Sequence, residues 1–362
     1  MNLISVLPAI RRAGTLAVGA LGILASGAFA DSISPTSFSA NLGVGEKVTV
    51  RKTVTITEAP TSALIDIAFV FDITGSMSGA IGGAKATATS VLTTLGGFGN
   101  VASGTGWYAD PQVDGVKSNL TTTIATTQAA INSLDACNSG SGFDSGLCGG
   151  DFPEAGYAGI TAAANGQSWR AGSNRFIVAL GDASFNNEGG GSLAGTQAAL
   201  AANDVELIGV SFGGAFTSAI TDITGSASSV FASSTDPDDI ADAILAGITG
   251  SFAKYSKVTV DDLGGGAGII GVDTVCVSAD TGTCSGSDAD GTYDRSISRT
   301  FEFDVTFTRL AGGDLTFDTF AIVDRGIVAA ERDTFTTPEP ATLVLMGVSL
   351  LGIGAARRRR TS

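Results

Sequence analysis

The chain has 362 residues, of which 50 are glycine and 44% are hydrophobic, and its formal net charge at pH 7 is −15. This composition fits a loop-rich globular protein rather than a disordered one, and the acidic excess argues against nucleic acid as a partner. The absence of histidine excludes His-dependent triads and His-ligated zinc, so a bound metal is expected to take oxygen ligands, as Mg²⁺, Ca²⁺ and Mn²⁺ do.

Residues 1–30 have the features of an export signal peptide. Arg11 and Arg12 precede an apolar run, and Ala28 and Ala30 match the small-residue pattern of a cleavage site. We therefore expect a mature chain that begins near Asp31 in an oxidising compartment. A short membrane anchor is the alternative interpretation.

Segments 31–62 and 255–336 share a strand pattern without a clear helix. Apolar and polar residues alternate with period two through 37–57 and through much of 256–331, as in half-exposed antiparallel strands. The first segment is too short to bury a core by itself. We predict that both flanks pair into one antiparallel β-sandwich, and two separate small units are the alternative.

One acidic segment of the second flank allows two interpretations. Residues 287–294 read SDADGTYD. Asp-Gly is a strong hairpin-turn signal, so we predict a turn, and part of a Ca²⁺ loop is the alternative.

Residues 63–254 alternate between apolar strand-like runs and helix-like stretches. The runs are LIDIAFVFD, GTGWYAD, RFIVALGD, VELIGVSFG and SSVFAS. Helix-like stretches cover 78–96, 119–135, 154–166, 193–203 and 216–224, and a last helix begins in STDPDDIADAILAGI. This order predicts an α/β domain, a doubly wound and mainly parallel sheet with helices on both faces, inserted between the flanks.

Acidic residues recur where these strands end. Asp72, Asp110 and Asp182 each end a strand run, and Asp151 and Glu154 precede a helix. Sites in doubly wound sheets form outside the carboxyl ends of the strands, so these carboxylates are expected at one rim. Thr74 and Ser76 follow Asp72 at two-residue steps, which suggests a divalent metal site. A strand end followed by a helix N-cap is the alternative.

The motif Asp72-x-Thr74-x-Ser76 resembles the metal-ion-dependent adhesion site (MIDAS) of von Willebrand factor type A (vWA) domains. The segments Asp151-Phe152-Pro153-Glu154 and Trp169-Arg170 make the match closest to the integrin β-subunit I-like domain, over roughly 63–254. The resemblance implies a primary Mg²⁺ or Mn²⁺ site with one open position for a carboxylate of a partner. Its residues would be Asp72, Thr74, Ser76, Glu154 and Asp182.

The same resemblance implies a second, structural cation site that could hold Ca²⁺. Asp110, Asp151, the carbonyl of Pro153 and Glu154 match its ligands, but Gly149 stands where that family has an asparagine. A third family site is expected to be absent, since Gly79 and Ala80 replace its acidic residues.

Four cysteines form two close pairs, Cys137 with Cys148 and Cys276 with Cys284. An oxidising compartment favours disulfides. Three connectivities are possible, of which the two local loops are the simplest. A zinc site built from all four cysteines is the alternative.

The last segment, 337–362, contains Pro338, Glu339 and Pro340, then a short apolar run, then Arg357, Arg358, Arg359 and Arg360. Four arginines after an apolar helix stay cytoplasmic by the positive-inside rule. The order resembles the PEP-CTERM sorting signal of Gram-negative bacteria. It implies transient insertion in the inner membrane as a transmembrane helix, removal of the tail by an exosortase, and release to the envelope or extracellular matrix. A plain tail anchor is the alternative.

These features predict an exported, cation-dependent adhesion module that binds an acidic group of a protein or matrix partner. A structural envelope or matrix component, in which the metal only stabilises the fold, is the alternative. An aspartyl-nucleophile phosphatase is disfavoured, because Thr74 stands where such enzymes place a second acid and no partner base is apparent.

Overall fold

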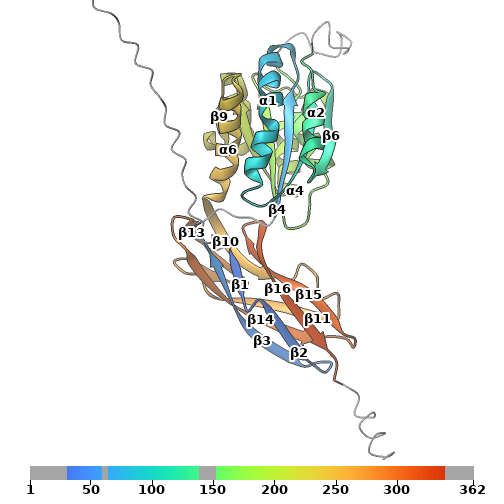
Figure 1. The fold of residues 1–362 in the computed structure, drawn as a ribbon, viewed down its shortest axis with the longest axis vertical. Helices are drawn as coiled ribbons and strands as arrows, with labels where there is room; N and C mark the ends of the chain where they lie inside the picture. The colour runs from blue at the N-terminus through green and yellow to red at the C-terminus, as the bar shows by residue number, and fades with distance from the viewer. Residues whose placement is uncertain (1–30, 59–63, 138–151, 339–362) are drawn as a thin grey trace, which may run out of the picture.

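Three β-sheets organise the part of the chain that the structure, a computed structural model, describes: residues 31–58, 64–137 and 152–338. One sheet lies in an α/β domain, and the other two form a β-sandwich (Figure 1). The export signal and almost all of the sorting tail fall outside the described residues.

The α/β domain is built on a six-stranded sheet with the order β6-β5-β4-β7-β8-β9, in which only β6 is antiparallel. The central strand β4 is buried along nearly its whole length, which explains its continuous apolar sequence. The strands are β4 (Leu64–Asp72), β5 (Asn100–Tyr108), β6 (Val113–Thr121), β7 (Asn174–Gly181), β8 (Val205–Ser211) and β9 (Val230–Ala232).

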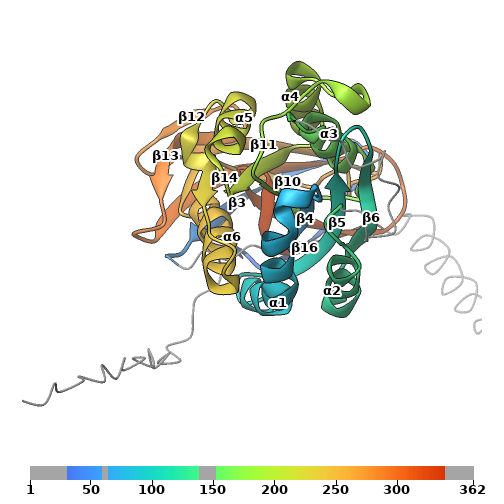
Figure 2. The ribbon, with the colours of Figure 1, turned by 90° about the horizontal axis from the view of Figure 1, so that it is seen from above.

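Helices cover both faces of this sheet (Figure 2): α1, α2 and α6 lie on one face, and α3, α4 and α5 on the other. The predicted doubly wound arrangement is therefore present. The helices are α1 (Ser78–Leu95), α2 (Ile124–Asn132), α3 (Gly156–Gly166), α4 (Leu193–Ala202), α5 (Gly214–Thr224) and α6 (Pro237–Phe252), with short 3₁₀ turns η1 (Gly75–Met77), η2 (Glu188–Gly190) and η3 (Ala227–Ser229).

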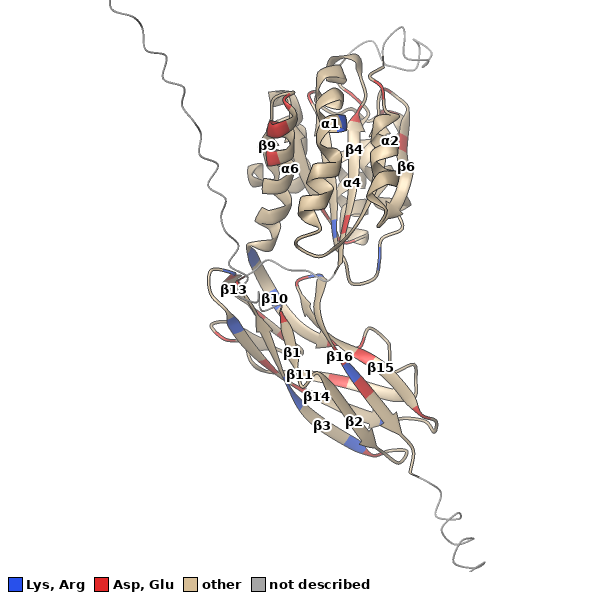
Figure 3. Ribbon diagram, in the orientation of Figure 1, with Lys and Arg blue, Asp and Glu red and all other residues tan. Residues whose placement is uncertain are grey.

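The start of α6 follows its sequence closely. Asp236 caps the helix by accepting from the Asp238 N–H at 2.9 Å, and Pro237 occupies the first turn. Asp238 and Asp239 place negative charge at the positive end of the helix dipole, in the acidic region beside β9 in Figure 3.

Two predicted elements were wrong. Residues 119–121 belong to the edge strand β6, and the helix predicted over 119–135 covers only Ile124–Asn132, because the alternating VDGVKSNLT segment pairs antiparallel with β5. Residues 288–294 form the strand β13 rather than a turn. Asp288 pairs there with Lys257 at 2.6 Å, and β12 and β13 meet at the positive-φ Gly286 instead.

Strands from both flanks share the sandwich sheets. One sheet has the order β1-β3-β14-β11, and the other β12-β13-β10-β15-β16-β2. The strands are β1 (Ser32–Ser34), β2 (Ser37–Asn41), β3 (Lys47–Ile56), β10 (Lys254–Asp261), β11 (Ile270–Ser278), β12 (Thr283–Ser285), β13 (Asp288–Asp294), β14 (Arg299–Arg309), β15 (Leu315–Val323) and β16 (Gly326–Thr336).

The pairing of β3 with β14 joins the two flanks along ten residue pairs. Phe301, Phe303, Val305 and Phe307 point into the core at alternate positions, as period two requires. On the outer face, Arg51 binds Glu302 at 2.9 Å and Asp304 at 2.6 Å, so positive and negative positions lie together there (Figure 3).

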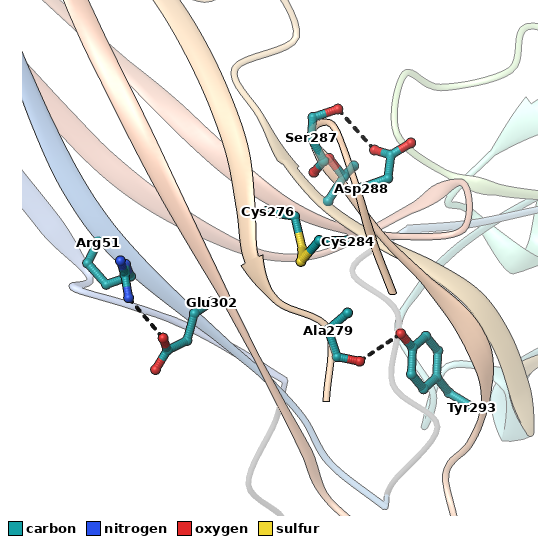
Figure 4. The surroundings of a disulfide bond; sticks show 9 residues. Arg51, Cys276, Ala279, Cys284, Ser287, Asp288, Tyr293 and Glu302 are labelled. Carbon is teal, nitrogen blue, oxygen red and sulfur yellow. Dashed lines mark hydrogen bonds and ion pairs between the residues drawn. A yellow bond between two sulfur atoms is a disulfide. The ribbon is translucent and has the colours of Figure 1, made fainter. Parts of the chain in front are cut away.

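The disulfide Cys276–Cys284 joins β11 to β12 and thereby links the two sandwich sheets (Figure 4). This pairing confirms one predicted local loop and rules out a zinc site made of all four cysteines. Cys137 is also disulfide-bonded, and its predicted partner Cys148 lies outside the described residues. Nearby, the Tyr293 hydroxyl donates to the Ala279 carbonyl at 2.9 Å.

Among the described residues, no helix combines the length and the apolar character that crossing a membrane requires. The predicted tail helix between Pro340 and Arg357 lies outside those residues.

Candidate metal centre

The residues around Asp72 form a compact group of oxygen atoms. Asp72 is the last residue of β4 and is fully buried. Its Oδ1 accepts from the Thr74 hydroxyl at 2.7 Å and from the Thr74 N–H at 2.9 Å. The hydroxyls of Thr74 and the exposed Ser76 lie 3.4 Å apart. Neither hydroxyl caps η1 or α1, which removes the support for the helix-cap interpretation.

Asp182 follows β7, the strand beside β4, and its charge acts on Asp72. Burial raises the pKa of Asp72 to about 7, the hydrogen bonds from Thr74 oppose this rise, and the negative charge of Asp182 adds to it. Asp72 Oδ2 and Asp182 Oδ1 are buried without a hydrogen-bond partner among the described residues. The charge of Asp182 therefore acts on the buried carboxyl of Asp72, and each of the two residues has one oxygen that no donor of the described residues satisfies.

A buried tyrosine, Tyr108, lies within electrostatic reach of the acidic residues. Tyr108 ends β5, is fully buried, and its hydroxyl has no partner in the described part of the chain. Burial raises its pKa, and the charges of Asp72, Glu154 and Asp182 raise it further. All three predicted carboxylates are therefore close enough to one buried hydroxyl to act on it. Sequence reasoning missed Tyr108, which reads as an ordinary apolar residue of a strand end.

Glu154 is brought to this rim by backbone pairing. Its N–H donates to the Ser184 carbonyl at 2.9 Å, and its carbonyl accepts from the Asn186 N–H at 2.8 Å. The loop after β7 therefore holds Glu154 next to the segment that begins with Asp182. Glu154 is 4% exposed.

Two ligands predicted for the second cation converge on an amide instead. The Nδ2 of Asn186 donates to Asp110 Oδ1 at 3.1 Å and to the Pro153 carbonyl at 2.6 Å. Asp151, another predicted ligand, lies outside the described residues. Asn186 was also missed from the sequence, where it lies four residues after Asp182.

The donor set suits a hard cation but is poor in direct carboxylate ligands. No group of three or more His, Cys, Asp or Glu side chains within the described ranges has a metal-binding arrangement. A cation near Asp72 would therefore depend on the hydroxyls of Thr74 and Ser76, with carboxylates that bind directly or through water. Oxygen ligands of this kind suit Mg²⁺ or Mn²⁺, and the buried, unpartnered oxygens of Asp72 and Asp182 fit a positive ion.

Residues 336–360 match the PEP-CTERM protein-sorting motif. The chain carries that sorting signal. The match confirms the prediction made from Pro338 to Arg360 and indicates an exported protein sorted to the cell envelope. No curated protein matches this sequence.

Several solved structures resemble the chain at low identity. Proximal thread matrix protein 1 from the mussel byssus is 16% identical, with 57% of this chain and 48% of that chain covered and a TM-score of 0.41. Its structure with a zinc-occupied MIDAS motif gives 17% identity over the same shares, with a TM-score of 0.42. The pilus adhesin SpaC from Lactobacillus rhamnosus GG, in its open conformation, is 13% identical, with 82% and 46% covered and a TM-score of 0.35. This chain spans about half the length of each.

Proposed function

We propose that this protein is an exported binding module that holds one divalent cation at the rim around Asp72 and uses it to bind an acidic group of a partner. The supporting observation is the pair of buried oxygens, Asp72 Oδ2 and Asp182 Oδ1, that have no hydrogen-bond partner among the described residues, while the Thr74 hydroxyl donates to the other oxygen of Asp72. Burying uncompensated negative charge is costly. A cation would remove that cost.

The exposure of each residue suggests its role in binding the ion. Ser76 is exposed and Thr74 is buried, so their hydroxyls would hold the ion between solvent and the strand end. The charge of the ion would be neutralised, directly or through water, by Asp72, Asp182 and Glu154 on the side away from solvent. When bound, the ion supplies a coordination position open to an outside carboxylate. This role is binding rather than catalysis.

The preferred ion is Mg²⁺ or Mn²⁺ on this proposal. Asn186 already satisfies Asp110 and the Pro153 carbonyl, so the region predicted for a second ion needs no Ca²⁺ to pair these two oxygens. The partner is proposed to be an envelope or matrix protein that offers a carboxylate. An exosortase-type enzyme would process the tail and release the protein after transient anchoring in the inner membrane.

Ion binding can be followed through the two tryptophans, Trp107 and Trp169, which both lie in the α/β domain. An ion that binds only the folded domain raises its stability in proportion to the logarithm of ion concentration. Titration with Mg²⁺, Mn²⁺ and Ca²⁺ should therefore raise the unfolding temperature seen by fluorescence. Flat calorimetric and thermal titrations with all three ions would refute the proposal.

The variant Asp182→Ala tests whether the ion also binds a partner. We expect it to keep its fold and to lose both the ion response and the chelator-sensitive capture of envelope proteins. Asp135→Ala is the matched control, since Asp135 is exposed and pairs with Lys85 at 3.0 Å. If the ion stabilises the domain but capture is the same with and without chelator, the metal has only a structural role.

A further inference from the structure

A lysine and two carboxylic acids lie together in the sandwich core. Lys52 on β3 faces Glu331 and Asp333 on β16, across the two sheets, and all three side chains are fully buried. Lys, Glu and Asp are almost never fully buried unless paired. The metal site does not involve this cluster, and an opposing charge pair alone explains only two of its three members.

The contacts show which groups can react. Lys52 Nζ contacts Glu331 Oε2 and lies 3.4 Å from Asp333 Oδ1. The Thr319 hydroxyl donates to Asp333 Oδ2, and Glu331 Oε1 has no hydrogen-bond partner in the described part of the chain. The Phe307 ring closes one side, with Lys52 Nζ 5.1 Å from its centre. Glu331 is therefore the carboxyl nearest to the amine, while Thr319 holds Asp333 beside it.

The cluster has more acid than base. Burial raises the pKa of Glu331 and of Asp333, and Lys52 opposes both rises. One ammonium cannot neutralise two carboxylates, so a buried site favours keeping one of them protonated. Moving one further proton from Lys52 to Glu331 yields a neutral amine beside two neutral acids, without any net change in charge.

We propose that Lys52 and Glu331 form an intramolecular amide bond that joins the two sandwich sheets. The neutral Lys52 Nζ attacks Glu331 Cδ, so an N–C bond forms and the C–O bond to the acid hydroxyl breaks. Asp333 accepts a proton from the attacking nitrogen and returns one to the departing hydroxyl. An amine and a carboxylic acid become an amide and one water molecule, so no oxidant or cofactor is needed.

Two physical effects favour this bond inside the sandwich. Groups held in contact react as if at very high concentration, with effective molarities that reach about 10⁵–10⁸ M. The product replaces a buried charge pair, which is expensive to desolvate, by a neutral amide. The complete burial of all three side chains keeps out the water that would reverse the reaction.

The bond would lie on the path of force through the molecule. β16 leads directly into the sorting tail, and β3 leads into the α/β domain (Figure 1). A pull between the C-terminal end of β16 and a partner bound to the α/β domain would therefore pass through a covalent link rather than through side-chain packing between the sheets. At another point, Cys276–Cys284 joins the same two sheets.

Mass spectrometry of the full mature chain, denatured and reduced, tests the proposal. We expect a mass lower than the sequence mass by one water molecule. Trypsin should fail to cut after Lys52 and should yield peptide 52–85 joined to peptide 326–332. A folded wild-type chain with the full sequence mass, cut normally after Lys52, would overturn the proposal.

Three variants separate the roles of the cluster. Lys52→Met should keep the full mass, and Asp333→Asn, which retains both reacting groups, should lose water slowly or incompletely. Asp318→Asn is the control on the outer face, where Asp318 pairs with the exposed Arg332 at 2.5 Å, and it should lose water completely. A branch from Lys52 to the peptide that begins at Asp333 would overturn the assignment of Glu331.

Discussion

Removal of the Asp66 carboxylate should destabilise the α/β domain more than any change to a surface ion pair. Asp66 is fully buried in β4 and accepts three hydrogen bonds. Two come from Arg170, through its backbone N–H at 2.7 Å and its Nε at 2.5 Å, and the third comes from the Ser173 hydroxyl at 2.9 Å. Asp66→Ala leaves all three donors without this acceptor.

The contacts set the size of the effect. A hydrogen bond to a charged group contributes about 1.5–3 kcal/mol to stability. The sum of three such bonds, taken as independent, would exceed the loss of stability that follows when one partner of a buried ion pair is removed. Arg170 is 25% exposed and keeps its bonds to the Ile65 and Asn100 carbonyls, so water can solvate part of the loss. We therefore expect a decrease of about 3–5 kcal/mol in the free energy of unfolding.

Urea titration followed by tryptophan fluorescence, with chelator present, measures this loss in the α/β domain alone. The control is Asp135→Ala, which breaks the exposed pair with Lys85 and should cost about 0–1 kcal/mol. The slope of the transition should stay the same in both variants, since neither changes the surface exposed on unfolding. A loss for Asp66→Ala no larger than that of the control would refute the reasoning.

Neighbouring glycines of α1 should respond in opposite ways. A Cβ at exposed Gly82 meets no atom within 4 Å, so Gly82→Ala should raise the free energy of unfolding by about 0.5–1 kcal/mol. A Cβ at Gly83 would lie 2.6 Å from the Thr235 carbonyl oxygen, so Gly83→Ala should lower the free energy of unfolding by about 1–3 kcal/mol. Both are read by the same urea titration, and equal shifts would contradict the packing. Replacing Cys276 and Cys284, which close a loop of separation 8, by alanine should cost the sandwich about 2–3 kcal/mol. Circular dichroism should detect this loss while the tryptophan transition stays unchanged.

Periodicity predicted the α/β domain well because its central strands are buried on both faces. The run from Leu64 to Asp72 is apolar along its length, and it forms β4 with those limits. The edge strand β6 was missed because one side of it is exposed, so its polar residues resemble the start of a helix. The Asp-Gly pair at 290–291 failed as a turn signal because it lies within β13, which pairs irregularly with β10.

The candidate site could be predicted where it is local. Asp72, Thr74 and Ser76 lie within five residues; the Thr74 hydroxyl does donate to the Asp72 carboxylate, and the Ser76 hydroxyl lies 3.4 Å from that of Thr74. The positions of Glu154 and Asn186 depend on a loop that folds back over the sheet rim, and no local pattern specifies that contact. The roles of the predicted ligands stay predictions, which the ion titrations described above test.

The insertion of one domain into the other sets an order of folding. Thr49 and Thr306 hydrogen-bond across β3 and β14, although 257 residues separate them. Closing so long a loop is slow. A folded α/β domain shortens the distance between the two flanks, because β4 begins and α6 ends on the side of that domain nearest the sandwich (Figure 1). The early strands β2 and β3 must therefore wait during export for their late partners β16 and β14. Kinetic competition from aggregation should be strongest in that interval.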